Sequence, residues 1–211
     1  MPELPNAISD GIKMRITLLL FTILLSSCVQ TPKLIIPNAG RDEIFTKFVN
    51  PVTDKYNLAK LREISLPDDD LEIRVWRSSF EIDGFILKRT ADIWSAVAIK
   101  EINCKKFGDY FGDKIYELGK FKLSTPKSGW DNTWQKLANV GIIDLPYSYY
   151  IPMIDEGSYM METNIDGIYQ LRFYGEKEKS QEAEKMRKIG EIIAAEFGLY
   201  NFKVGSLCLE K

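Results

Sequence analysis

The sequence predicts an α+β domain in which an antiparallel β-sheet carries an amphipathic C-terminal helix and a second helix packed on one face. Residues 71–75 alternate apolar and polar side chains, which is typical of a strand with one buried face. Asp166-Gly167 separates two more strand-like segments and suits a tight hairpin turn. Residues 181–197 repeat apolar side chains at helical spacing. Strands followed by a final helix of this kind favour the α+β class.

Most of the first half of the domain is expected to form strands. Alternation from Leu71 to Phe80 predicts the first of them. Asp83-Gly84 suits a tight turn, after which Phe85 to Lys88 would begin a second strand. Ile93 to Ile102 fits either a third strand or a helix, and its β-branched residues favour the strand.

A long excursion and a helix are expected next. Lys105 to Gly119 is rich in glycine and charge, and Lys120 to Leu123 fits a short strand. Ser128 is predicted to cap a helix, because an acidic residue follows it three positions later in a pattern that resembles a capping box. Gly141 supplies the end of this helix.

The end of the chain is predicted to form a hairpin and then the clearest helix. Ser158 to Asn164 and Ile168 to Tyr174 fit the two hairpin strands. Ser180 is expected to cap the final helix, and Gly198 to end it. Phe202 to Leu209 could then return as an edge strand.

The large aromatic and the basic residues of these elements are assigned to opposite environments. Arg74 and Arg172 lie in predicted strands and are expected on the polar side of the sheet. The tryptophans are expected in the core, and they are Trp76, Trp94, Trp130 and Trp134.

The composition excludes several classes of function. With 28 basic and 30 acidic residues the net charge is −2, so no basic excess exists to neutralise phosphates and nucleic acid is not an expected partner. The chain contains no histidine. Ser-His-Asp and Cys-His nucleophiles are therefore excluded, as are histidine-ligated metal sites. Neither a cofactor nor a metal is expected.

The N-terminal segment has the layout of a secretory signal. Lys13 and Arg15 precede a run of ten residues, Ile16 to Leu25, which is shorter than the roughly 18–20 apolar residues of a membrane-spanning helix. Small residues then lead to Cys28. The alternatives are a buried N-terminal helix, or a plain signal peptide in which this cysteine has no special role. The start at Met1 or Met14 stays open.

Leu25-Ser26-Ser27-Cys28 resembles a bacterial lipobox. The resemblance implies a lipoprotein signal peptide over residues 1–27, removed so that Cys28 carries a diacylglyceryl thioether and usually an acylated amine such as a palmitate amide. Two or more acyl chains hold a protein stably on a membrane. Val29 stands where aspartate tends to retain lipoproteins at the inner membrane, so an outer-membrane location facing the periplasm is favoured. Residues 28–57 are then expected to be the lipidated cysteine and a tether, and residues 58–211 a single α+β domain.

Three motifs of the domain occur in an order that is similar to a family of secreted and lipid-anchored bacterial proteins. They are Glu72 to Trp76, then Trp130 to Trp134, then Asp166 to Tyr174 before the C-terminal helix. That family is uncharacterised, so the resemblance implies the fold class and the location, with no activity and no functional residues.

Two cysteines remain after Cys28. Cys104 and Cys208 could form a disulfide in an oxidising compartment, which would close a loop of about 100 residues and contribute up to ~4.7 kcal/mol. The alternative is a pair of buried free thiols that behave as small apolar side chains. Sequence alone does not place the two within bridging distance.

Candidate chemistry is weak throughout the chain. Ser124 and Lys127 match the S-x-x-K pattern of serine acyltransferases, but Pro126 lies between them and no partner motif occurs, so a loop is favoured. Paired acids could support glycoside hydrolysis or calcium binding, yet all lie in turn-like segments where solvated acids are expected. These acids are Asp109 and Asp113, Asp155 and Glu156, and Asp68 to Asp70.

The most distinctive surface candidate is a tyrosine-rich segment. Tyr147, Tyr149 and Tyr150 offer rigid contact area and hydroxyl groups, so they could form an interaction loop for protein or glycan. The alternative is a crossover packed along the sheet edge, which is favoured on general grounds.

Together these features predict a lipid-anchored cell-envelope protein that binds a protein or an envelope component and has no catalytic activity. The alternative is a histidine-free hydrolase that acts on envelope glycans through carboxylates. Whether the chain is an enzyme stays open, with binding favoured.

Overall fold

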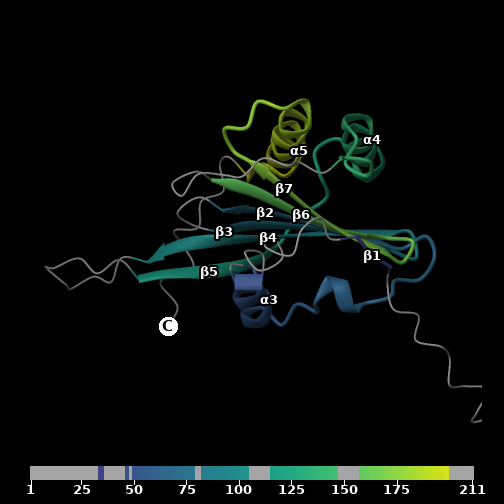
Figure 1. The fold of residues 1–211 in the computed structure, drawn as a ribbon. Coiled ribbons are helices and arrows are strands. Elements are labelled where there is room, and N and C mark those ends of the chain that lie inside the picture. Colours follow the sequence, from purple (N-terminus) through teal and green to yellow (C-terminus); the bar gives the residue numbers. More distant parts are fainter. Residues whose placement is uncertain are drawn as a thin grey trace, which may run out of the picture. The chain divides into compact units, whose positions relative to one another are not determined.

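The computed structural model describes residues 33–35, 46–47, 49–78, 82–104, 115–146 and 157–199. All of them belong to one compact unit, residues 31–211. The predicted α+β class is confirmed, with helices packed on a sheet whose strands are almost all antiparallel (Figure 1). Within the described residues, no helix is long and apolar enough to cross a membrane.

In the described part of the chain, the sheet has seven strands in the order β1-β7-β6-β2-β3-β4-β5. Only β1 pairs in parallel with its neighbour, β7. The strands are β1 (Lys33–Ile35), β2 (Leu71–Ser78), β3 (Ile82–Thr90), β4 (Ile93–Cys104), β5 (Ile115–Lys122), β6 (Ser158–Ile165) and β7 (Ile168–Gly175). The helices are α3 (Asn50–Lys55), the short 3₁₀ helix η1 (Leu61–Glu63), α4 (Trp130–Val140) and α5 (Gln181–Phe197).

Helices cover both faces of the sheet. Figure 1 shows α4 and α5 together on one face and α3 on the other. The face under α4 and α5 has an apolar core to which Leu71, Ile73 and Val75 of β2 contribute, as their alternation predicts. From α5 the same core takes the apolar stripe, whose buried members are Met186, Ile189 and Ile193. The second predicted helix and the C-terminal helix therefore share one face.

Arg74 and Arg172 were expected on the polar side of the sheet, but both are buried, because both faces of the sheet are covered. Arg74 is 2% exposed and Arg172 is 3% exposed. Arg74 is covered by the segment between α3 and η1, whose Ala59 carbonyl oxygen accepts a hydrogen bond from its Nη2 at 2.8 Å. Arg172 lies on the helical face, where Thr163 and the Ile143 carbonyl accept its hydrogen bonds.

Part of the expected tether belongs to the folded domain. Val49 and Val52 are buried in a second apolar cluster under the sheet, together with Trp76 and Leu171. A boundary at residue 58 is therefore too late, because α3 packs on the sheet before that point. With only six residues, α3 is too short to show a helical stripe in the sequence.

The expected turn at Asp83-Gly84 is also wrong, because both residues lie inside β3 and pair with Arg77 and Trp76 of β2. Glycine is required at position 84 because the Trp76 ring lies close to its backbone. A Cβ atom at this position would lie 2.5 Å from Cζ3 of the Trp76 indole ring, which is well inside van der Waals contact.

Other local predictions are confirmed or shifted by a few residues. Asp166 and Gly167 have φ of 50° and 70°, as a tight hairpin turn requires. The Ser180 Oγ accepts a hydrogen bond from the Ala183 N–H at 3.1 Å and caps α5. By contrast, α4 has Gly129 at its N-cap, and the Ser128 hydroxyl contacts Thr133 within the helix. β5 is longer than expected and begins at residue 115.

Candidate functional site

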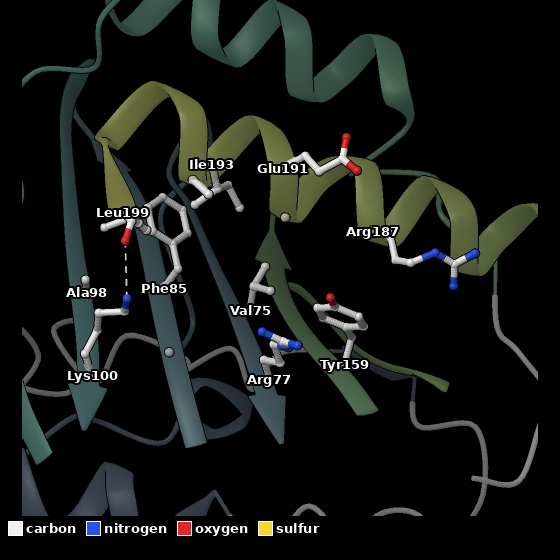
Figure 2. Close-up of a pocket in the computed structure, with 13 residues that line it drawn as sticks. Val75, Arg77, Phe85, Ala98, Lys100, Tyr159, Arg187, Glu191, Ile193 and Leu199 are labelled. Atoms are coloured by element: carbon white, nitrogen blue, oxygen red, sulfur yellow. Dashed lines mark hydrogen bonds between the residues drawn. The ribbon is translucent and has the colours of Figure 1, made fainter. Parts of the chain in front are cut away.

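A cavity of about 320 Å³ lies between α5 and the sheet. Its floor is formed by β2, β3 and β4, and its roof by α5 (Figure 2). We call it the α5 cavity. Apolar side chains form most of its wall, and they are Val75, Phe85, Ala98, Ile193, Ala194 and Leu199. This volume is at the lower end of the roughly 300–1,000 Å³ that is usual for small-molecule sites.

Charged and polar side chains stand at the two ends of the α5 cavity. Figure 2 shows Arg77, Tyr159 and Arg187 toward one end, and Lys100 with Leu199 at the other. The Lys100 Nζ donates to the Leu199 carbonyl oxygen at 3.4 Å. Arg77 forms an ion pair with Glu176. The cavity is therefore apolar in the middle and cationic at both ends.

The backbone that follows β7 holds Arg187 at its end of the α5 cavity. Its Nη1 donates to the carbonyl oxygens of Glu176 and Glu178, at 3.2 and 2.8 Å. Glu178 in turn accepts from the Gly175 N–H and from the Ser180 hydroxyl, which is the residue that caps α5. The start of the helix, the end of β7 and the arginine are thus fixed relative to one another.

Tyr159 places a hydroxyl group at this end of the α5 cavity. Its own strand, β6, pairs it with Arg77 of β2 and with Tyr174 of β7. Burial raises the pKa of the Tyr159 hydroxyl above 10.0, and Arg77 opposes this only in part. The hydroxyl therefore stays protonated at neutral pH and can donate a hydrogen bond. It has no hydrogen-bond partner among the described residues.

Gly190 lies on the lining of the α5 cavity, in the middle of α5. Glycine in a helix interior costs about 1 kcal/mol relative to alanine. Packing does not require it here, because a Cβ atom would meet nothing closer than Tyr159 Cε1 at 4.0 Å. The missing side chain leaves space in the roof of the cavity.

A second cavity, of about 260 Å³, lies on the opposite face beside the segment after α3. Its wall is mixed, and the charged side chains in it are Glu72, Arg74, Lys88 and Lys120. Glu72 accepts a hydrogen bond from the Arg74 Nε at 2.7 Å and pairs with the Lys88 Nζ at 3.6 Å. The Arg74 Nη1 is buried and has no hydrogen-bond partner among the residues that the structure describes.

A buried carboxylate, Glu162, lies near this network and outside the linings of both cavities. Burial raises its pKa above 4.5, and the Arg74 charge and two hydrogen bonds oppose the shift. These bonds come from the Trp76 Nε1 and the Tyr169 hydroxyl, each at 3.0 Å. A raised pKa is often a sign of an active site, but here the shift comes from burial, and the partners of Glu162 are side chains of the core.

Most of the residues singled out from the sequence lie outside the described part of the chain. This holds for Cys28, for the interaction loop Tyr147, Tyr149 and Tyr150, and for the acids at 109, 113, 155 and 156. Cys104 is the last residue of β4, but Cys208 lies outside the described residues, so their pairing stays a prediction.

The remaining candidate residues from the sequence lie in loops and turns. Ser124 and Lys127 are exposed in the loop before α4. Asp68 and Asp69 are exposed, whereas the carboxylate of Asp70 is buried and accepts a hydrogen bond from the Ala91 N–H at 2.9 Å.

Of the four tryptophans, only Trp76 is fully buried. Trp94, Trp130 and Trp134 are partly buried and pack against the core under α5. The stacked rings of Trp94 and Trp130 have centroids 6.2 Å apart.

Sequence reasoning missed the residues that form the α5 cavity. Arg77, Tyr159 and Arg187 come from three elements, and no local pattern marks them as neighbours. One signal was present, since Gly190 interrupts an otherwise regular amphipathic helix without ending it.

The described residues contain no group of three or more cysteine, aspartate or glutamate side chains that could hold a metal ion. The comparisons with known proteins add no family: no protein-family model matches the chain, and no curated protein is significantly similar to it. The candidate site therefore depends on the geometry of the α5 cavity alone.

Proposed function

We propose that this protein is a lipid-anchored component of the bacterial cell envelope that works by binding, without catalysis, and that the α5 cavity is its binding site. The observation that carries the proposal is the cavity itself, which combines an apolar wall with converging cationic groups and a hydroxyl donor. Such a combination is typical of sites that bind small molecules or short segments of a partner.

The location follows from the lipobox-like Cys28 and stays a proposal. With the acylated cysteine in the outer membrane, the domain would face the periplasm, and Val29 favours this destination over the inner membrane. A Cys28→Ala variant should then move from the membrane pellet to the soluble fraction after cell lysis. Retention of the variant in the pellet would contradict lipid anchoring.

Binding without catalysis is favoured over carboxylate-based hydrolysis by the chemistry of the cavity wall. Glycosidases need two facing carboxyl groups about 5–9.5 Å apart beside the substrate. The lining of the α5 cavity contains one carboxylate, Glu191, and this group pairs with the Lys188 Nζ at 3.0 Å on the exposed side of α5.

The binding role can be tested in cells with a photo-crosslinking amino acid at Glu191, at the edge of the α5 cavity. The matched control carries the same amino acid at Asn139, an exposed position on α4. We expect a dominant crosslinked product from position 191 only, which mass spectrometry would identify. Equal products from both positions, or none from position 191, would overturn the binding role of the cavity.

A further inference from the structure

The charge balance of the α5 cavity indicates what kind of ligand it can hold. Its lining has three cationic side chains, Arg77, Lys100 and Arg187, and one carboxylate, Glu191. Glu176 pairs with Arg77, and Lys188 pairs with Glu191. With these two partners included, four cationic side chains and two carboxylates lie in or beside the lining, which favours an anionic over a cationic ligand.

The apolar wall restricts the ligand further. Phe85 and Ile193 line the cavity between its two polar ends, and Leu199 adds apolar surface at the Lys100 end. A small inorganic anion would leave this surface in contact with water and would gain nothing from it. An apolar chain that fills the same space removes the surface from water, and each buried methylene group contributes about 0.8 kcal/mol.

The hydrogen-bond donors are gathered at one end. Tyr159 offers a hydroxyl without a partner among the described residues, and it lies near the guanidinium groups of Arg77 and Arg187 (Figure 2). An anionic headgroup at this end would receive charge-assisted hydrogen bonds, which are stronger than those between neutral groups.

Gly190 provides an independent reason to regard the space as retained for a ligand. An alanine at this position would suit the helix better and would meet no steric conflict. A glycine that weakens the helix and at the same time keeps the roof open is expected where something occupies the cavity.

We propose that the α5 cavity binds a small amphipathic anion, with its apolar chain between Phe85 and Ile193 and its anionic headgroup beside Arg77, Tyr159 and Arg187. This inference depends on the proposed binding role and adds the class of the ligand. An acyl chain with a carboxylate is the simplest member of the class, and an anionic lysophospholipid shares the same chemistry.

The test measures binding to the mature chain by calorimetry, with ten-carbon probes kept below their micelle concentrations. Decanoate should bind at least tenfold more tightly than decanol and than decyltrimethylammonium, because only decanoate combines the chain with a negative charge. Equal affinities for decanoate and decanol would overturn the ligand class. The second comparison uses lysophosphatidylglycerol with the same ten-carbon acyl chain. If it binds more tightly than decanoate, the natural ligand is a phospholipid, and if it binds more weakly, the natural ligand is a free carboxylate.

Variants locate the binding in the cavity. Arg187→Gln should weaken decanoate binding about tenfold, whereas Lys185→Gln, on the same helix but outside the lining, should leave it unchanged. Gly190→Leu should abolish binding by filling the roof, and its thermal unfolding will show that the fold is intact. Unchanged decanoate affinity in both Arg187→Gln and Gly190→Leu would overturn the inference.

The two proposals fail in different ways. If position 191 crosslinks to a dominant partner while all three ten-carbon probes bind equally or not at all, the ligand class is wrong and the binding role stands. If the crosslinks do not depend on position and Gly190→Leu changes no binding, both proposals fail.

Discussion

The two faces of strand β2 are buried by different means. Under α4 and α5 the buried side chains of β2 are Leu71, Ile73 and Val75, all apolar. On the other face the same strand buries Glu72 and Arg74, and Trp76 with its indole N–H bonded to a carboxylate. One strand therefore contributes hydrocarbon to one face and a charged network to the other.

Substitutions on the two faces should therefore change the stability of the domain by different amounts. Removing part of an apolar side chain leaves a cavity and costs the free energy of the lost contacts. Removing one member of a buried charged network leaves its partners desolvated and uncompensated, which costs more than the pair itself contributed. The charged face should therefore be the more sensitive of the two, although its apolar cluster is smaller.

Arg74→Met should give the largest loss of stability, about 3–5 kcal/mol, because it leaves the buried carboxylates of Glu72 and Glu162 without their main cation. Chemical denaturation of the purified domain measures the change. Lys60→Met is the control, since its ion pair with Glu63 spans 3.8 Å and is exposed, and it should cost less than about 1 kcal/mol. A loss for Arg74→Met no larger than that of the control would remove the contrast between the faces.

Ile189→Ala tests the apolar face and should cost about 2–5 kcal/mol, because Ile189 is fully buried in the core under α5. The matched control is Ile168→Ala, at a position that is 37% exposed. Denaturant unfolding of both variants gives the comparison. If the two losses were equal, burial would not be what stabilises this face.

Gly84→Ala should destabilise the domain by about 1–3 kcal/mol, because the new methyl group overlaps the Trp76 ring on the charged face. The effect should shrink in a Trp76→Leu background, where the ring is absent. A double-mutant cycle by chemical denaturation measures this coupling. Additive losses would mean that contact with Trp76 is not the reason for glycine.

Glu196→Gln should have the smallest effect. Partial burial opposes ionisation of Glu196, but hydrogen bonds from the Lys136 Nζ at 2.5 Å and from the Ser128 N–H at 2.9 Å outweigh it. Together they lower its pKa from 4.5 to about 2. Because Lys136 is 49% exposed and its charge is screened, the loss at neutral pH should be below about 1 kcal/mol.

The pH dependence of this effect has a definite sign. A lowered carboxyl pKa stabilises the fold above the unfolded value, and the contribution disappears as pH falls from 4.5 toward about 2. The stability difference between the wild type and Glu196→Gln should therefore be constant above about pH 5 and vanish near pH 2. Thermal unfolding across this range measures it, and a difference that persists at pH 2 would contradict the assignment.

Local patterns predicted most of the elements of this domain. The alternation of β2, the Asp166-Gly167 turn and the stripe of α5 each depend on spacing within one short segment, and all three are present. The local prediction was wrong where a residue is required by a contact with a residue distant in the sequence. Gly84 was assigned to a turn because glycine favours turns, but the structure has it facing Trp76 across the sheet.

The burial of Arg74 shows the same limit. Its position in the alternation is correct, yet an alternating strand indicates only that two faces differ, and it does not say what covers each of them. The segment between α3 and η1 covers this face and accepts a hydrogen bond from Arg74. The six-residue α3 is too short to produce a periodic signal.

The sequence by itself determined the fold class, the identity of the main strands and helices, and the chemistry that the absence of histidine excludes, because each of these depends on composition or on spacing along one segment. Only the tertiary structure decided which side chains meet. Arg77 from β2, Tyr159 from β6 and Gly190 from α5 line one cavity because sheet register and helix packing bring them together. That arrangement depends on contacts between residues far apart in the chain, and apart from Gly190 within the helical stripe no local pattern marks these residues.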